Sequence, residues 1–107
     1  MADFLTVSTT TDSADSAAAL ARSAVTARLA ACAQVEGPVT SVYWWRGTVD
    51  TAQEWRVVLK TTGERYAALE AHLRAAHPYE VPEVIAVPVV AGSPDYLAWV
   101  GAETTGH

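Results

Sequence analysis

The chain has 107 residues and a formal net charge of −5; half of its residues are hydrophobic and 18% are charged. This length suits one domain spanning residues 1–107. Basic residues stand singly, so the sequence predicts no nucleic-acid partner. No apolar run is long enough for a transmembrane helix and no basic leader begins the chain, so no membrane association or secretion is expected. One cysteine, Cys32, cannot form an internal disulfide, and the expected location is the reducing cytoplasm.

The first half of the chain predicts a strand, a helix and a second strand. Residues 4–9 form a short β-branched and apolar run, which is typical of a strand. Residues 16–33 contain no Gly or Pro and follow good N-cap residues, so a helix is expected there. The Gly37-Pro38 pair is expected to break the chain before a second strand over residues 39–45.

A turn at residues 46–48 predicts a hairpin whose second arm is a strand over residues 54–62. Side chains alternate along a strand, so two sets should face opposite ways. One set, expected to be mostly buried, is Trp55, Val57, Leu59 and Thr61. The other set is Glu54, Arg56, Val58 and Lys60.

The second half predicts a helix, a strand and a short terminal helix. Residues 65–76 carry apolar side chains at the spacing of a buried helical stripe. Residues 84–90 form a strand, in which Pro88 requires a bulge or a side free of pairing. Ser93 and Pro94 start a helix that reaches about Val100, and the tail 101–107 is expected to fray.

The predicted order is β-α-β-β-α-β with a terminal helix. This is the split β-α-β order of the ferredoxin-like α+β class. Right-handed crossovers would place the two long helices on one face of an antiparallel sheet, with the short C-terminal helix added.

Three segments resemble the CutA family of divalent-cation tolerance proteins. They are RLAAC at 28–32, VTSVYWWRG at 39–47 followed by a strand ending in Lys60-Thr61, and HPYEVPEVIAVP at 77–88 with YLAW at 96–99. The resemblance implies a cytoplasmic homotrimer linked to tolerance of divalent metals, chiefly copper. It also implies an architecture like that of the PII signalling proteins, with no organic cofactor and no firmly attached catalytic activity.

Three residues are candidate ligands for copper or another divalent cation: Cys32, His77 and Glu80. A thiol, an imidazole and a carboxylate suit such ions, although the spacing is not that of a metal finger. Cys32 could instead be a small buried hydrophobe, and His77 could simply finish the second helix. A nucleophilic role of Cys32 with His77 as base lacks an orienting third group, so no enzyme activity is predicted.

Adjacent aromatic residues indicate an interface between subunits. Tyr43, Trp44 and Trp45 must alternate across the strand, so at least one ring should point away from the core, which favours a subunit contact. A pocket at that contact could take a small ligand, with Lys60 supplying positive charge. The candidate inter-subunit pocket comprises Tyr43, Trp44, Trp45, Lys60, Tyr79 and Trp99.

Two functions remain open from the sequence. The first is a trimeric, non-enzymatic protein that binds divalent metal, copper first, in clefts between subunits. The second is a PII-like signalling or scaffold trimer that binds a small metabolite or a protein partner in those clefts.

Overall fold

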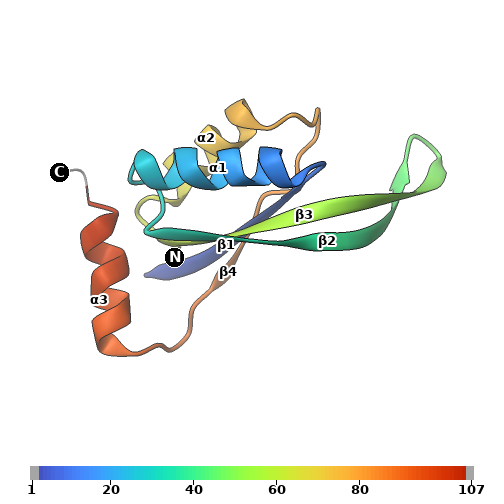
Figure 1. Cartoon of the computed structure of the whole chain (residues 1–107). Helices are drawn as coiled ribbons and strands as arrows, with labels where there is room; N and C mark the ends of the chain where they lie inside the picture. The colour runs from blue at the N-terminus through green and yellow to red at the C-terminus, as the bar shows by residue number, and fades with distance from the viewer. Residues whose placement is uncertain (1–2, 106–107) are drawn as a thin grey trace.

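The computed structural model describes residues 3–105, which form one four-stranded sheet and three helices (Figure 1). In chain order the elements are β1 (Phe4–Thr11), α1 (Ala14–Thr26), β2 (Cys32–Trp45), β3 (Thr48–Thr62), α2 (Tyr66–Ala76), β4 (Ile85–Pro88) and α3 (Pro94–Glu103).

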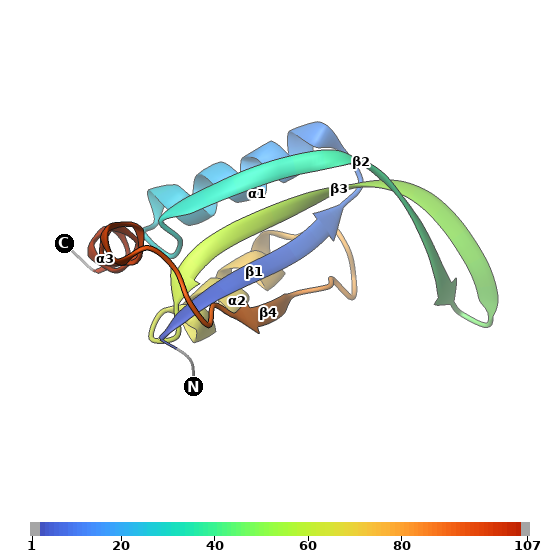
Figure 2. The ribbon, with the colours of Figure 1, turned by 90° about the horizontal axis from the view of Figure 1, so that it is seen from below.

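The sheet has the strand order β2-β3-β1-β4, and each neighbouring pair is antiparallel. Helices α1 and α2 lie together on one face, and α3 lies at the end of the sheet where β2 begins (Figures 1 and 2). The opposite face is open over most of its length. The predicted α+β fold, with an antiparallel sheet and both long helices on one face, is therefore confirmed.

The core lies between the helices and the inner face of the two central strands. Val7 of β1 and Val57 and Leu59 of β3 are buried on that face, and Leu69 and Leu73 of α2 pack above them. Helix α1 contributes mostly alanines, whose small side chains allow a helix to approach the sheet closely. This burial of apolar surface is the main stabilising contribution to the fold.

The first helix ends earlier than predicted, and β2 begins earlier. Helix α1 ends at Thr26, and Arg28 then takes a left-handed conformation with a φ of 61°. The amide of Ala31 already donates to the carbonyl oxygen of Lys60 at 2.9 Å. The helical prediction for residues 27–33 was wrong: a turn through the left-handed Arg28 ends the helix, and from Ala31 onward bonding to β3 overrides the helix propensity of the Ala-rich run.

The Gly37-Pro38 pair interrupts the register of β2 without ending the strand. Glu36 faces Arg56 and Val39 faces Glu54, so the two intervening residues form an irregularity opposite Trp55. The predicted break at this pair was therefore wrong. The hairpin is longer than predicted in both arms. Strand β2 begins at Cys32, and β3 begins directly after the turn, at Thr48.

The C-terminal part contains two further differences. Strand β4 spans only Ile85–Pro88 and pairs with β1 alone, so Pro88 lies on an edge strand with one side free of pairing, as predicted. Helix α3 continues to Glu103, and the buried Thr104 hydroxyl donates to the carbonyl oxygen of Val100 at 2.8 Å. Fraying was the wrong prediction for residues 101–104; residues 106–107 lie outside the described part.

Candidate functional site

An open cavity lies where the far end of the hairpin faces the loop between α2 and β4. Its volume is about 720 Å³. The hairpin bends at its far end toward the side of the helices, which brings its tip near this loop (Figures 1 and 2). The lining residues are Thr10, Ser41, Val42, Tyr43, Trp44, Trp45, Glu54, Pro78, Tyr79, Glu80, Val81 and Glu83.

A buried carboxylate and a tyrosine form the floor of this cavity. Glu54 on β3 is only 8% exposed, and its Oε2 accepts a hydrogen bond of 2.7 Å from the hydroxyl of Tyr79. Burial, and then this bond, raise the pKa of the Tyr79 hydroxyl well above its ordinary value. Tyr79 therefore remains a hydrogen-bond donor to Glu54 at any physiological pH. The sequence predicted Glu54 on the same strand face as Arg56, opposite the mostly buried face. In the structure Tyr79 packs over Glu54 and buries its side chain.

His77 fixes the loop that carries Tyr79. Its Nε2 lies 2.8 Å from the carbonyl oxygen of Thr10 and 3.1 Å from the Thr9 hydroxyl, and its Nδ1 accepts from the Tyr79 amide at 3.1 Å. A carbonyl only accepts and an amide only donates, so the ring carries its proton on Nε2. Its ring also packs on that of Tyr79, with centroids 4.8 Å apart. Both ring nitrogens are thus engaged within the chain.

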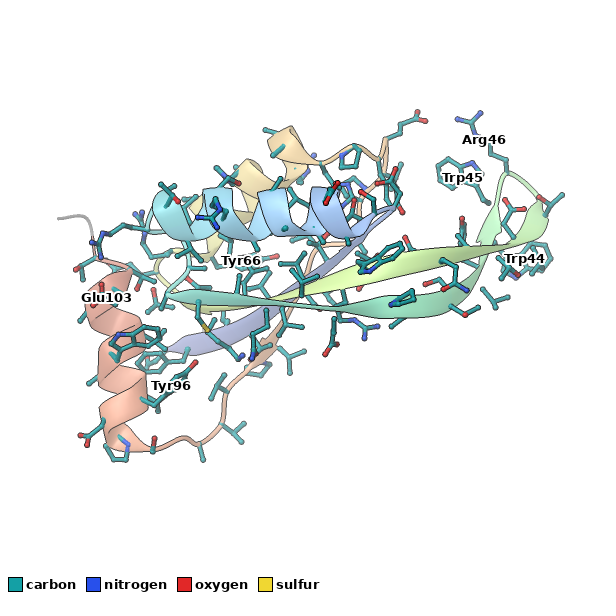
Figure 3. All side chains as sticks on the ribbon, viewed as in Figure 1. Trp44, Trp45, Arg46, Tyr66, Tyr96 and Glu103 are labelled. Atoms are coloured by element: carbon teal, nitrogen blue, oxygen red, sulfur yellow. The ribbon has the colours of Figure 1, made fainter. Side chains whose placement is uncertain are left out.

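The mouth of the cavity holds a guanidinium group from the hairpin turn. Arg46 Nη2 lies 3.1 Å from Glu80 Oε2, and its guanidinium carbon lies 5.2 Å from the centroid of the Trp45 ring. Figure 3 shows Trp45 and Arg46 together on the side of the tip nearer the helices, with Trp44 on the other side. Both charged partners are exposed, so this ion pair contributes little to stability.

A second polar cluster lies at the opposite end of β2, beside α3. Cys32 Sγ is 3.5 Å from the Tyr96 hydroxyl, and Lys60 Nζ donates to Gln34 Oε1 at 3.4 Å. The Tyr96 ring packs on Trp99, with centroids 5.7 Å apart. The hydrogen bond to Cys32, and then burial, raise the pKa of Tyr96 to about 12.

The three predicted metal ligands do not come together in one chain. Cys32 pairs with Lys60, which is level with Thr6 of β1, whereas His77 contacts Thr9 and Thr10. Four residues along a strand separate these positions by about 13 Å. Across residues 3–105, no group of three or more His, Cys, Asp and Glu side chains could hold a metal ion. Cys32 is half-buried and next to Tyr96, so it is not the fully buried hydrophobe considered above.

The predicted pocket residues fall into two groups. Tyr43, Trp44, Trp45 and Tyr79 line the cavity, while Lys60 and Trp99 lie in the cluster around Cys32. Lys60 therefore supplies no positive charge to this cavity within one chain. Glu54 was not among the predicted site residues. A carboxylate directly before Trp55 in the predicted strand was the available signal, but only the fold places it under Tyr79.

Three tyrosines make the stability of this protein sensitive to alkaline pH. The folded state raises the pKa of Tyr66, Tyr79 and Tyr96 above the ordinary value of 10.0. Their stabilising contribution is therefore complete below about pH 10 and is lost as the pH rises above it, because the unfolded chain releases these protons first. We expect the urea midpoint to fall between about pH 8 and about pH 11, and to fall less in Tyr79→Phe. An equal fall in that variant would contradict the assignment.

In the described part of the chain, none of the helices is long and apolar enough to cross a membrane.

The chain is similar to proteins named for tolerance of divalent cations. It is 39% identical to the divalent-cation tolerance protein CutA of Thermus thermophilus, over 91% of this chain and 93% of that protein. It is 43% identical to the CutA homolog of Xenopus laevis over 77% of this chain; the match spans about half the length of that protein (54%) and of the rice (48%) and mouse (46%) relatives.

Solved structures give the same result. The crystal structure of CutA from Xylella fastidiosa matches with a TM-score of 0.94 and 36% identity, covering 97% of this chain and all of that one (100%). Residues 5–103 match the sequence model of the family described as CutA1 divalent ion tolerance protein. The chain therefore belongs to the CutA1 divalent ion tolerance family.

Proposed function

We propose that this chain forms a cytoplasmic homotrimer that binds divalent cations, copper first, between its subunits, with no catalytic step. The observation that supports assembly is the amount of apolar surface left exposed by a single chain. Large apolar side chains are exposed on the hairpin (Val42, Trp44 and Val49), on β4 and after it (Ile85, Val87 and Val90) and on α3 (Tyr96 and Trp99). A soluble protein avoids such extensive apolar exposure unless a partner covers it.

The free edges of the sheet support the same proposal. Strands β2 and β4 each pair on one side only, so each presents unpaired backbone groups along its outer edge. A closed ring of identical subunits can cover edges and apolar side chains together. The number three rests on the family resemblance.

In this proposal the metal is held by donors from more than one subunit. Cys32 is half-buried and Glu80 is exposed, so both remain accessible to a neighbouring copy. Both ring nitrogens of His77 make hydrogen bonds that hold the loop, so in this proposal His77 positions Glu80. His77 could bind the metal itself only if one of these hydrogen bonds broke. Thiolate and carboxylate from different subunits would supply the ligand set that one chain lacks.

Light scattering behind size exclusion, followed by calorimetric titration with copper, tests both parts. We expect a mass near three subunits, and copper binding that is lost in Cys32→Ala and weakened in Glu80→Gln. The matched control is Glu64→Gln, which removes an exposed carboxylate outside both clusters. A monomer would contradict the assembly, and unchanged copper binding in Cys32→Ala would contradict the metal site.

A second candidate function is favoured by the cavity itself. A volume of about 720 Å³ lies within the range of small-molecule sites in proteins. Under this candidate the trimer binds a small metabolite or a protein partner and signals its presence, a role suggested by the likeness to PII signalling proteins that the family resemblance implies.

A further inference from the structure

We propose that the cavity between the hairpin tip and the α2–β4 loop binds a small organic cation of the primary-ammonium class. The inference deepens the second candidate function, small-molecule binding, and is independent of metal binding at Cys32. It rests on the charge of the lining, on the buried carboxylate and on the aromatic walls.

The charged side chains that line the cavity all carry the same sign. Glu54, Glu80 and Glu83 line it, and the lining contains no Lys, Arg or His. Arg46 stands at the mouth and neutralises only Glu80. A concave site with low-dielectric walls focuses such a field, so a cation is the ligand that this lining favours.

Glu54 supplies a specific acceptor inside the cavity. It is more than nine-tenths buried, and Tyr79 holds one of its oxygens, Oε2, at 2.7 Å. The other oxygen, Oε1, has no hydrogen-bond partner within residues 3–105, although it belongs to a residue that lines the cavity. Among the described residues the only fully buried side-chain nitrogen or oxygen without a hydrogen-bond partner is Nε of Arg65, so Oε1 of Glu54 is accessible from the cavity, where it can accept an N–H bond from a bound ammonium group.

The aromatic walls favour an organic cation over a bare metal ion. Tyr43, Trp45 and Tyr79 line the cavity together with Glu54, and of these only Tyr79 contacts the Glu54 carboxylate directly. Aromatic faces attract ammonium and guanidinium groups. The chain itself shows this chemistry at the mouth, where the Arg46 guanidinium contacts both the Trp45 ring and Glu80. Within residues 3–105 no three carboxylate, imidazole or thiol groups lie close enough together to coordinate a divalent ion, so one chain offers no competing metal site.

The probe is n-butylammonium, with n-butanol and butyrate as neutral and anionic compounds of similar shape. Binding to the assembled full-length protein is followed by calorimetry and by tryptophan fluorescence, because Trp44 and Trp45 line the cavity. We expect binding of the ammonium compound, and weaker or no binding of the other two. Glu54→Gln should weaken it about tenfold or more, because a charged hydrogen bond is lost.

Trp45→Leu provides a second variant that does not alter a buried polar group, should Glu54→Gln fail to fold. It should weaken ammonium binding severalfold, while the Glu64→Gln control should match the wild type. Equal binding of all three compounds would overturn the cation assignment and leave small-molecule binding intact. No binding of any of them, or wild-type affinity in Trp45→Leu, would overturn the proposal. If copper displaced the probe, and if copper binding were lost in Glu54→Gln alone, the Glu54 carboxylate would be a metal ligand instead.

Discussion

His77→Ala should lower the free energy of unfolding by about 2–4 kcal/mol. The imidazole is 9% exposed and joins three backbone or hydroxyl groups from β1 and the α2–β4 loop. Alanine would leave the carbonyl of Thr10 and the amide of Tyr79 without these partners and open a small void beside them. Unfolding in urea, followed by circular dichroism, measures the change.

His72→Ala is the matched control, because His72 lies in α2 one helical turn before its end. Its Nε2 makes one hydrogen bond, of 2.9 Å, to the Ser23 hydroxyl, and its side chain is only partly buried. The loss there should be about 1 kcal/mol or less. If the two variants were equally stable, the network around His77 would not hold the loop as described. A large loss of copper binding without loss of stability in His77→Ala would instead make His77 a metal ligand.

Gly37→Ala should destabilise the protein by about 1–3 kcal/mol, because a Cβ at this position has no room. It would lie 2.7 Å from Trp55 Cδ1 and 3.1 Å from the carbonyl oxygen of Glu54. The first atoms of an indole ring cannot move aside without rotating the whole Trp55 side chain. Thermal unfolding measures the loss, and the same variant should disturb Glu54 and hence the cavity.

Gly101→Ala in α3 is the opposite control. A Cβ there meets no atom within 4 Å, and the residue lies within a helix. Alanine restricts the unfolded chain and favours the helix, so a gain of about 0.5–1 kcal/mol is expected. Similar effects at both positions would show that contact with Trp55 does not limit residue 37.

The sequence predicted the elements well where the local pattern and the tertiary fold agree. The alternating side chains of β3 placed Val57, Leu59 and Thr61 on the buried face, and all three are buried. The prediction failed for residues 27–33, where an Ala-rich run continues the helical pattern although a turn ends the helix and bonding to β3 begins at Ala31. It failed again at Gly37-Pro38, because an irregular pair can be carried within a ladder whose neighbouring residues remain bonded.

The candidate site was only partly predictable for a related reason. The aromatic run 43–45 and Tyr79 are visible as a motif, and they do line one cavity. Lys60 and Trp99 were grouped with them, yet they lie at the other end of the sheet, next to Cys32. Residue types indicate a kind of chemistry, whereas the grouping of side chains depends on the register of strands far apart in the sequence.

The fold class, the element order and the family could be predicted from the sequence, because they follow from periodicity, turn residues and contiguous motifs. The contacts of Glu54 and His77 become visible only in the folded chain. The bend of the hairpin and the α2–β4 loop bring Tyr79 over Glu54, and β1 brings the Thr10 carbonyl to His77. Those contacts join residues 25 and 67 positions apart along the chain, and such long-range contacts leave no local trace in the sequence.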